Sequence, residues 1–220
     1  MTSETISLKT TEIIMEKKNN ITNGNRITAV SLIVVLISIV MISVSTVLPV
    51  WKVKLYANNY PKGLKLIAYG YTFEGDLYEL NIINHYVGMQ EINPDEISIM
   101  ALFPYAIGLL IVCSILTLFY KKYKRILALL WLGFPIGILA VIQWYLYYFG
   151  HHLEAGAPIR MPPFSPWVIG SSHIMNFKAV GMVDYGFILL VLGILAFGFG
   201  EDLLGKIYKW FFAKKKNSNS

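Results

Sequence analysis

Three stretches of this chain are each at least 23 residues long and contain no charged side chain. They cover residues 27–49, 98–120 and 126–149, and a fourth apolar stretch, residues 183–200, contains a single charged residue, Asp184. About 20 consecutive apolar residues are enough for a helix to cross a hydrocarbon core about 30 Å thick. The composition agrees, because 15% of the residues are charged, against about 25% in a soluble domain. The sequence therefore predicts an all-α integral membrane protein with four transmembrane helices.

The distribution of lysine and arginine orients these helices. Residues 1–26, 121–125 and 201–220 hold 4, 4 and 5 of the 19 basic residues, whereas the long loops 50–97 and 150–182 hold 4 and 2. Lys and Arg are retained on the cytoplasmic side of short loops. We therefore expect both termini in the cytoplasm, a basic tail that is mobile, and both long loops outside the cytoplasmic membrane. Basic residues spread over three segments argue against nucleic-acid binding and leave the lipid bilayer as the expected partner.

The first long loop has the patterns of a small folded domain. Residues 51–57 and 64–73 alternate apolar with polar or aromatic side chains, and residues 58–63 between them are rich in turn formers, which predicts a β-hairpin. Residues 77–89 have apolar side chains at near-helical spacing, which predicts a short helix at the membrane surface. The second loop, residues 150–182, is rich in proline, and we expect an irregular cover over the helix bundle.

Apart from serine and threonine, few polar side chains fall within the predicted spans. Gln143 lies in the third span, where a buried amide usually hydrogen-bonds another helix. Asp184, at the outer edge of the fourth span, is either a functional group or an interfacial acid that is hydrated or paired with Arg160 or Lys178. The spans thus offer little polar chemistry of their own.

The histidines are the main candidates for chemistry, and all four lie outside the spans on the predicted outer side: His85, His151, His152 and His173. His85 precedes Met89 by four residues, which places both on one face of a helix, and His173 precedes Met175 by two. Imidazole and thioether ligands suit copper, above all Cu(I). These four residues are therefore candidate metal ligands. The alternative is that they pack or face water.

The sequence lacks the signatures of common enzymes. It contains no Walker loop, no G-x-S-x-G elbow and no H-E-x-x-H motif, and its one cysteine excludes an intrachain disulfide framework. The spans have no histidine to ligate a haem and few polar groups that would mark a transport path. We therefore expect a protein that is not an enzyme.

Three segments together resemble a family of small bacterial and archaeal membrane proteins encoded near accessory genes for nitrous oxide reductase and copper handling. They are residues 60–64 (YPKGL), 81–89 (NIINHYVGM) and 162–171 (PPFSPWVIGS). The resemblance implies a copper-handling or copper-enzyme assembly role at the outer face of the membrane, with His85 and Met89 as the ligand pair and a copper enzyme as partner. A scaffold or subunit of a larger membrane complex, such as a permease-associated protein, is the alternative.

Overall fold

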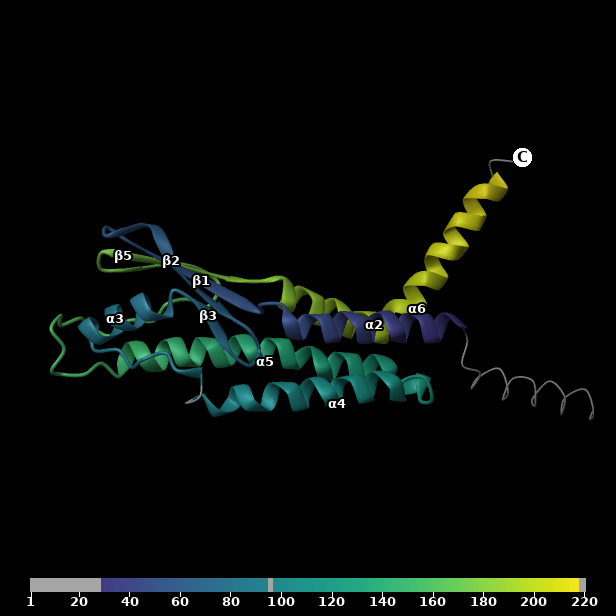
Figure 1. Ribbon diagram of the computed structural model, residues 1–220. Helices are drawn as coiled ribbons and strands as arrows, with labels where there is room; N and C mark the ends of the chain where they lie inside the picture. Colours follow the sequence, from purple (N-terminus) through teal and green to yellow (C-terminus); the bar gives the residue numbers. More distant parts are fainter. Residues whose placement is uncertain (1–28, 95–96, 218–220) are drawn as a thin grey trace, which may run out of the picture.

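Long helices run side by side through most of the molecule, and a small β-sheet lies against one end of them (Figure 1). The computed structural model describes residues 29–94 and 97–217. Four helices in this part of the chain are long and apolar enough to cross a membrane, as the sequence predicts. They are α2 (Ala29–Val47), α4 (Phe103–Leu116) with the preceding 3₁₀ turn η2 (Ser98–Leu102), α5 (Lys124–His151) and α6 (Tyr185–Asn217). The predicted N-terminal segment, residues 1–26, lies outside the described residues.

Helix α6 continues past the predicted end of its span at residue 200 as far as Asn217, so most of the expected mobile tail prolongs the helix. Residues 201–217 contain no proline that would end it. Glu201 and Asp202 also tie this part of the helix to the first turn of α5. The Lys124 ammonium lies 2.9 Å from the Glu201 carboxylate, and the Arg125 guanidinium lies 2.7 Å from that of Asp202.

Small residues at seven-residue intervals bring α2 and α6 into close antiparallel contact. The heptad series are Ser31, Ser38 and Ser45 on α2, all buried, and Gly186, Gly193 and Gly200 on α6. The Ser38 hydroxyl donates to the Gly193 carbonyl at 2.6 Å, across the helix pair. A Cβ added at Gly193 would lie 2.8 Å from Ile42, and one at Gly200 would lie 2.8 Å from Val34. The absence of side chains at these glycines is what allows the helices to pack so closely.

The remaining helices pack on this pair from two sides. Helix α5 lies against α6, where Gly198 faces Ala128, and α4 lies against α2. The turn η3 (Lys121–Tyr123) joins α4 to α5 as briefly as the sequence predicts. The backbones of α4 and α5 nevertheless stay apart for most of their length. Large side chains fill part of the space, with the rings of Phe103 and Phe134 6.0 Å apart.

The two long loops together form one antiparallel five-stranded sheet. Its strand order is β3-β2-β1-β5-β4. The strands are β1 (Trp51–Ala57), β2 (Tyr60–Ala68), β3 (Phe73–Gly75), β4 (Gly170–Ile174) and β5 (Phe177–Val183). The predicted hairpin is confirmed as β1 and β2, although its turn is only Asn58-Asn59 and β2 already begins at Tyr60.

The sheet is therefore larger than the single predicted hairpin, and the expectation of an irregular second loop is wrong for residues 170–183, which form β4, β5 and their turn. The prolines of this loop lie at residues 158–166, and the strands begin only after them. Residues 177–183 then pair with β1 along almost its whole length, from Trp51 opposite Val183 to Tyr56 opposite Lys178. The edge of β1 left free by the first hairpin supplies the hydrogen-bonding partner that the local pattern did not reveal.

Strands β1 and β5 prolong the α2–α6 pair almost without interruption. Three residues separate α2 from β1, and Asp184 alone separates β5 from α6. At this junction the Asp184 amide donates to the Val50 carbonyl at 3.1 Å, and its carboxylate lies 3.0 Å from the Lys52 ammonium. The predicted partners, Arg160 and Lys178, are thus not the ones that Asp184 uses. The reason is the β1–β5 register, which brings Lys52 to the end of β5.

Candidate functional site

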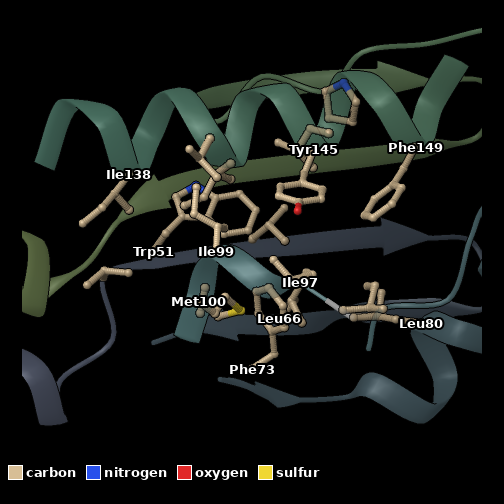
Figure 2. Close-up of a pocket in the computed structure, with 18 of the residues that line it drawn as sticks. Trp51, Leu66, Phe73, Leu80, Ile97, Ile99, Met100, Ile138, Tyr145 and Phe149 are labelled. Atoms are coloured by element: carbon tan, nitrogen blue, oxygen red, sulfur yellow. The ribbon is translucent and has the colours of Figure 1, made fainter. Parts of the chain in front are cut away.

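A cavity of about 580 Å³ lies between the sheet, the 3₁₀ turn η2 and the half of α5 that runs beside the sheet. Figure 2 shows Tyr145 and Phe149 directed from α5 toward Leu66, Leu80 and Ile97 on the opposite walls. Among the described residues that line the cavity, none carries a charge. Its volume falls within the range of about 300–1,000 Å³ that is typical of small-molecule sites.

One face of the sheet forms a wall of the cavity. Alternate residues of β1, namely Trp51, Val53 and Leu55, point to this face, because successive side chains of a strand alternate between its two faces. Leu66 and Ala68 of β2 continue it. Lys52 and Lys54 of β1 and Lys65 of β2 alternate with these residues and belong to the other face. The alternation that predicted the hairpin thus also produces the apolar wall.

Five residues of helix α5, spaced four apart, line the cavity in a row that winds slowly around the helix: Gly133, Gly137, Val141, Tyr145 and Phe149. Its 28 residues make a helix about 42 Å long. The row runs along α5 toward the half of the helix that lies beside the sheet. A Cβ built at either glycine meets no heavy atom within 4 Å, so the space beside both is open, and the cavity extends along α5 as far as Gly133.

The cavity also extends between α4 and α5. Leu102, Phe103 and Ala106 line it from the start of α4, opposite Gly133 and Gly137 of α5. These residues belong to segments apolar enough to span a membrane. Since the backbones of α4 and α5 are separated, one end of the cavity lies between two candidate membrane spans. The other end lies against the sheet.

The predicted helix in the first loop is confirmed as α3 (Leu77–Val87), and it forms the remaining wall. Its buried residues Leu80, Asn84 and Val87 all line the cavity. The helix ends at Gly88, whose φ of 76° is in the left-handed region that favours glycine. The Met89 amide donates to the Asn84 carbonyl at 2.8 Å, which completes this cap.

Residues 84–89 (NHYVGM), the end of the motif at 81–89, also hold the two long loops together. The Gly88 carbonyl accepts a hydrogen bond from the Glu154 amide at 2.9 Å, and the Tyr86 carbonyl accepts one from the Ile159 amide at 2.9 Å. A Cβ at Gly88 would lie 2.8 Å from that of Ala157, so the second loop passes directly over this glycine. Asn84 and Gly88 of the motif therefore have structural roles in closing the cavity.

Gln143 secures the proline-rich part of the second loop to α5. Its side-chain amide donates to the Pro166 carbonyl at 3.0 Å, and its carbonyl oxygen accepts from the Val168 amide at 2.8 Å. The expectation that Gln143 hydrogen-bonds another helix is wrong, because α5 extends beyond the other helices into the region of the loops. The amide satisfies two backbone groups that the non-repetitive loop leaves unpaired.

Most polar side chains that line the cavity have partners within the protein. The Trp51 indole N–H donates to the Val168 carbonyl at 2.6 Å, and Asn84 donates to the Gln90 carbonyl at 3.4 Å. The Tyr69 hydroxyl donates to the Glu74 carboxylate at 3.1 Å, and this hydrogen bond raises the pKa of Tyr69 above its ordinary value. The hydroxyl of Tyr145 forms no hydrogen bond with any residue in the described ranges.

The predicted metal ligands are found in two different places. Met89 lines the large cavity, and His85, four residues earlier on α3, is exposed. His173 and Met175 border a separate depression at the turn between β4 and β5. Within residues 29–94 and 97–217 no three His, Cys, Asp or Glu side chains gather in a group that could hold a metal ion. His151 and His152 stack on Tyr147 and Tyr148, with ring centroids 4.0 Å apart in both pairs.

The cavity was not predicted from the sequence, although one signal for it is present. Every fourth residue from 133 to 149 is in turn glycine, glycine, valine, tyrosine and phenylalanine, which places small residues at one end of a row along the helix and aromatic residues at the other. The sequence does not reveal what faces this row, because the opposite walls come from η2 and the sheet. Comparisons with protein-family models, curated proteins and solved structures find no match to this chain, so its function has to be argued from the cavity itself.

Proposed function

We propose that this chain is a multi-pass membrane protein that binds the apolar chain of a lipid-like molecule in the cavity beneath its sheet. The observation that carries the proposal is the cavity of about 580 Å³, lined without a charged side chain and continued between α4 and α5. A charged solute would have to lose its hydration there without gaining a counter-ion, which is costly. A hydrocarbon chain loses nothing comparable.

The position of the cavity also favours a molecule that comes from the bilayer. The end of the cavity away from the sheet lies between two candidate spans, so a hydrocarbon chain could pass between α4 and α5 without crossing water. Each methylene moved from water into an apolar site contributes about 0.8 kcal/mol, but one moved from lipid contributes far less, because lipid is itself apolar. Selection among bilayer components would therefore depend on shape and on polar groups in the cavity.

The proposed orientation places the sheet outside the cytoplasmic membrane. The basic turn at residues 121–125 lies at the end of the helices away from the sheet (Figure 1). Lys and Arg in short connections are retained in the cytoplasm, so this end would face inward. Four crossings would then put both chain ends on the same, cytoplasmic side.

A glycine pair provides a matched test of the cavity. Gly137 lines the cavity and Gly108 on α4 does not, and at both positions an added Cβ meets nothing within 4 Å. Gly137→Leu should fill the cavity and reduce the bound lipid-like molecule, whereas Gly108→Leu should leave it unchanged. The measurement is native mass spectrometry of the detergent-purified proteins, with extraction and identification of the bound molecule. Equal retention by both variants, or none by the wild type, would contradict the proposal.

A second candidate function, binding of a soft metal ion, is favoured by the turn between β4 and β5. Among the described residues Met175 is the one non-glycine with a positive φ, 51°. A two-residue hairpin turn requires a positive φ at this position, so the turn itself places Met175 at the tip of the hairpin. Met175 is 61% exposed and borders the same depression as His173. We propose that this pair holds Cu(I), in line with the copper-handling role that the sequence resemblance implies.

Two double variants distinguish the candidate ligand pairs. We expect His173→Ala/Met175→Ala to abolish Cu(I) binding, while His85→Ala/Met89→Ala retains it, because the latter pair is divided between an exposed position and the apolar cavity. The measurement is competition with a Cu(I) chelator on detergent-purified protein under anaerobic, reducing conditions. The reverse pattern would favour the α3 pair that the resemblance implies. Copper binding by neither the wild type nor the variants would exclude the metal role and favour a scaffold or subunit.

A further inference from the structure

Tyr145 is the cavity-lining residue whose polar group is left for a ligand. The Trp51, Tyr69 and Asn84 side chains each donate a hydrogen bond within the protein. The Tyr145 hydroxyl has no such bond among the described residues. Figure 2 shows this hydroxyl directed from α5 into the cavity, toward the apolar residues of the opposite walls.

The aromatic ring of Tyr145 is held in place by its neighbours. It meets Trp144 edge to face at 4.9 Å between centroids, and Phe149 lies 5.6 Å away. Both neighbours are on the same helix, so the ring position does not depend on a ligand. The phenol is therefore a preorganised donor, and a hydroxyl in an apolar environment gains most from one well-placed acceptor.

The absence of charge in the lining restricts what that acceptor can be. A carboxylate or phosphate would meet a single neutral donor and no cation among the lining residues, and burial of an unpaired charge is strongly unfavourable. A carbonyl oxygen asks for one hydrogen bond and brings no charge. It can be part of an otherwise apolar molecule that fills the rest of the cavity.

We propose that the Tyr145 hydroxyl donates a hydrogen bond to a carbonyl oxygen of the bound molecule, so that the cavity selects a neutral, carbonyl-bearing apolar chain. This inference rests on the proposed function and adds the chemical class of the ligand. Two membrane components have this chemistry, namely the ester groups of glycerolipids and the ring carbonyls of isoprenoid quinones. Both place a neutral oxygen beside a long hydrocarbon chain.

The test compares two probes of equal chain length, heptadecane and 2-heptadecanone, as competitors of a decyl-pyrene probe on detergent-purified protein. Tyr145→Phe removes the hydroxyl and keeps the ring contacts. We expect it to weaken binding of 2-heptadecanone about five-fold, the effect of one hydrogen bond, and to leave heptadecane unchanged. Tyr147→Phe is the control, because Tyr147 lies two residues away on α5 and does not line the cavity. It should alter neither probe.

The outcomes separate this inference from the proposed function. If neither probe competes in the wild type, or if Gly137→Leu does not affect them, the cavity does not bind apolar chains and both proposals fail. If both probes bind in the cavity but Tyr145→Phe changes them equally, the cavity binds chains and the carbonyl inference is overturned. A diacylglycerol and an isoprenoid quinone, used as competitors of the same pyrene probe, identify the natural ligand. The ligand is the one whose binding Tyr145→Phe weakens. If Tyr145→Phe weakens the binding of neither, the inference is overturned.

Discussion

Single glycines in this protein have opposite roles that their sequence context does not distinguish. Gly186 follows the start of α6 by one residue and packs against the end of α2, where an added Cβ would collide with the Leu48 carbonyl oxygen. Gly108 is in the middle of α4, where an added Cβ meets nothing within 4 Å. Both lie in apolar helices, so only the packing separates a required glycine from a dispensable one.

This difference predicts effects of opposite sign for the same substitution. Gly186→Ala should lower the free energy of unfolding by about 1–3 kcal/mol, because the new methyl group overlaps a backbone atom that cannot rotate away. Gly108→Ala should raise it, by up to about 1 kcal/mol, because alanine favours the helix and has room. Thermal unfolding in one detergent, followed by circular dichroism, measures both. A destabilised Gly108→Ala would show that α4 has a partner at this face.

At the scale of elements, the junction between β5 and α6 depends on one buried acid. The Asp184 side chain is 8% exposed and its Oδ1 accepts from the Tyr185 amide at 2.8 Å, next to the start of α6. Its other oxygen lies 3.0 Å from Lys52 on β1. A negative charge near a helix N-terminus is also favoured by the helix dipole. One carboxylate thus connects a strand, a neighbouring strand and a membrane helix.

Asp184→Asn should weaken this junction while keeping an acceptor for the Tyr185 amide. We expect a loss of about 1–2 kcal/mol in the free energy of unfolding, less than for a fully buried pair because Lys52 is 39% exposed and remains hydrated. A double-mutant cycle with Lys52→Met measures the coupling. If the two losses are simply additive, the ion pair contributes nothing and the effect of Asp184 lies in the helix start alone.

Sequence patterns predicted the elements of this molecule better than their partners. Hydropathy located four spans, and strict alternation located β1, because both signals are local. The pairing of β1 with β5 was not predicted, since it joins residues far apart in the chain and residues 177–183 (FKAVGMV) show no regular alternation of polar and apolar side chains. The partner of Asp184 was missed for the same reason. A local pattern does not specify which strand will lie beside another.

At the scale of the whole molecule, the cavity exists because one helix extends further toward the sheet than its neighbours. Helix α5 extends past α2 and α6 to lie under the sheet, and α4 stays apart from it. The cavity occupies the space between these elements, so its walls come from both long loops and from two spans. Of the residues that line the cavity, Met89 alone was predicted from the sequence as a site residue. The rest could not be predicted without knowing that the two loops form one sheet.

The central position of β1 in the sheet has a consequence for how the chain is made. Its partner β5 follows about 130 residues later. At about 5–20 residues per second, synthesis of the intervening chain takes on the order of ten seconds. During that time β1 is an unprotected edge, open to pairing with other nascent chains. Lys52 and Lys54 alternate along it, and charges on such an edge discourage wrong pairing. Lys52 then pairs with Asp184 once the start of the last span has been made. The same lysine therefore discourages wrong pairing of the incomplete sheet and stabilises the complete one.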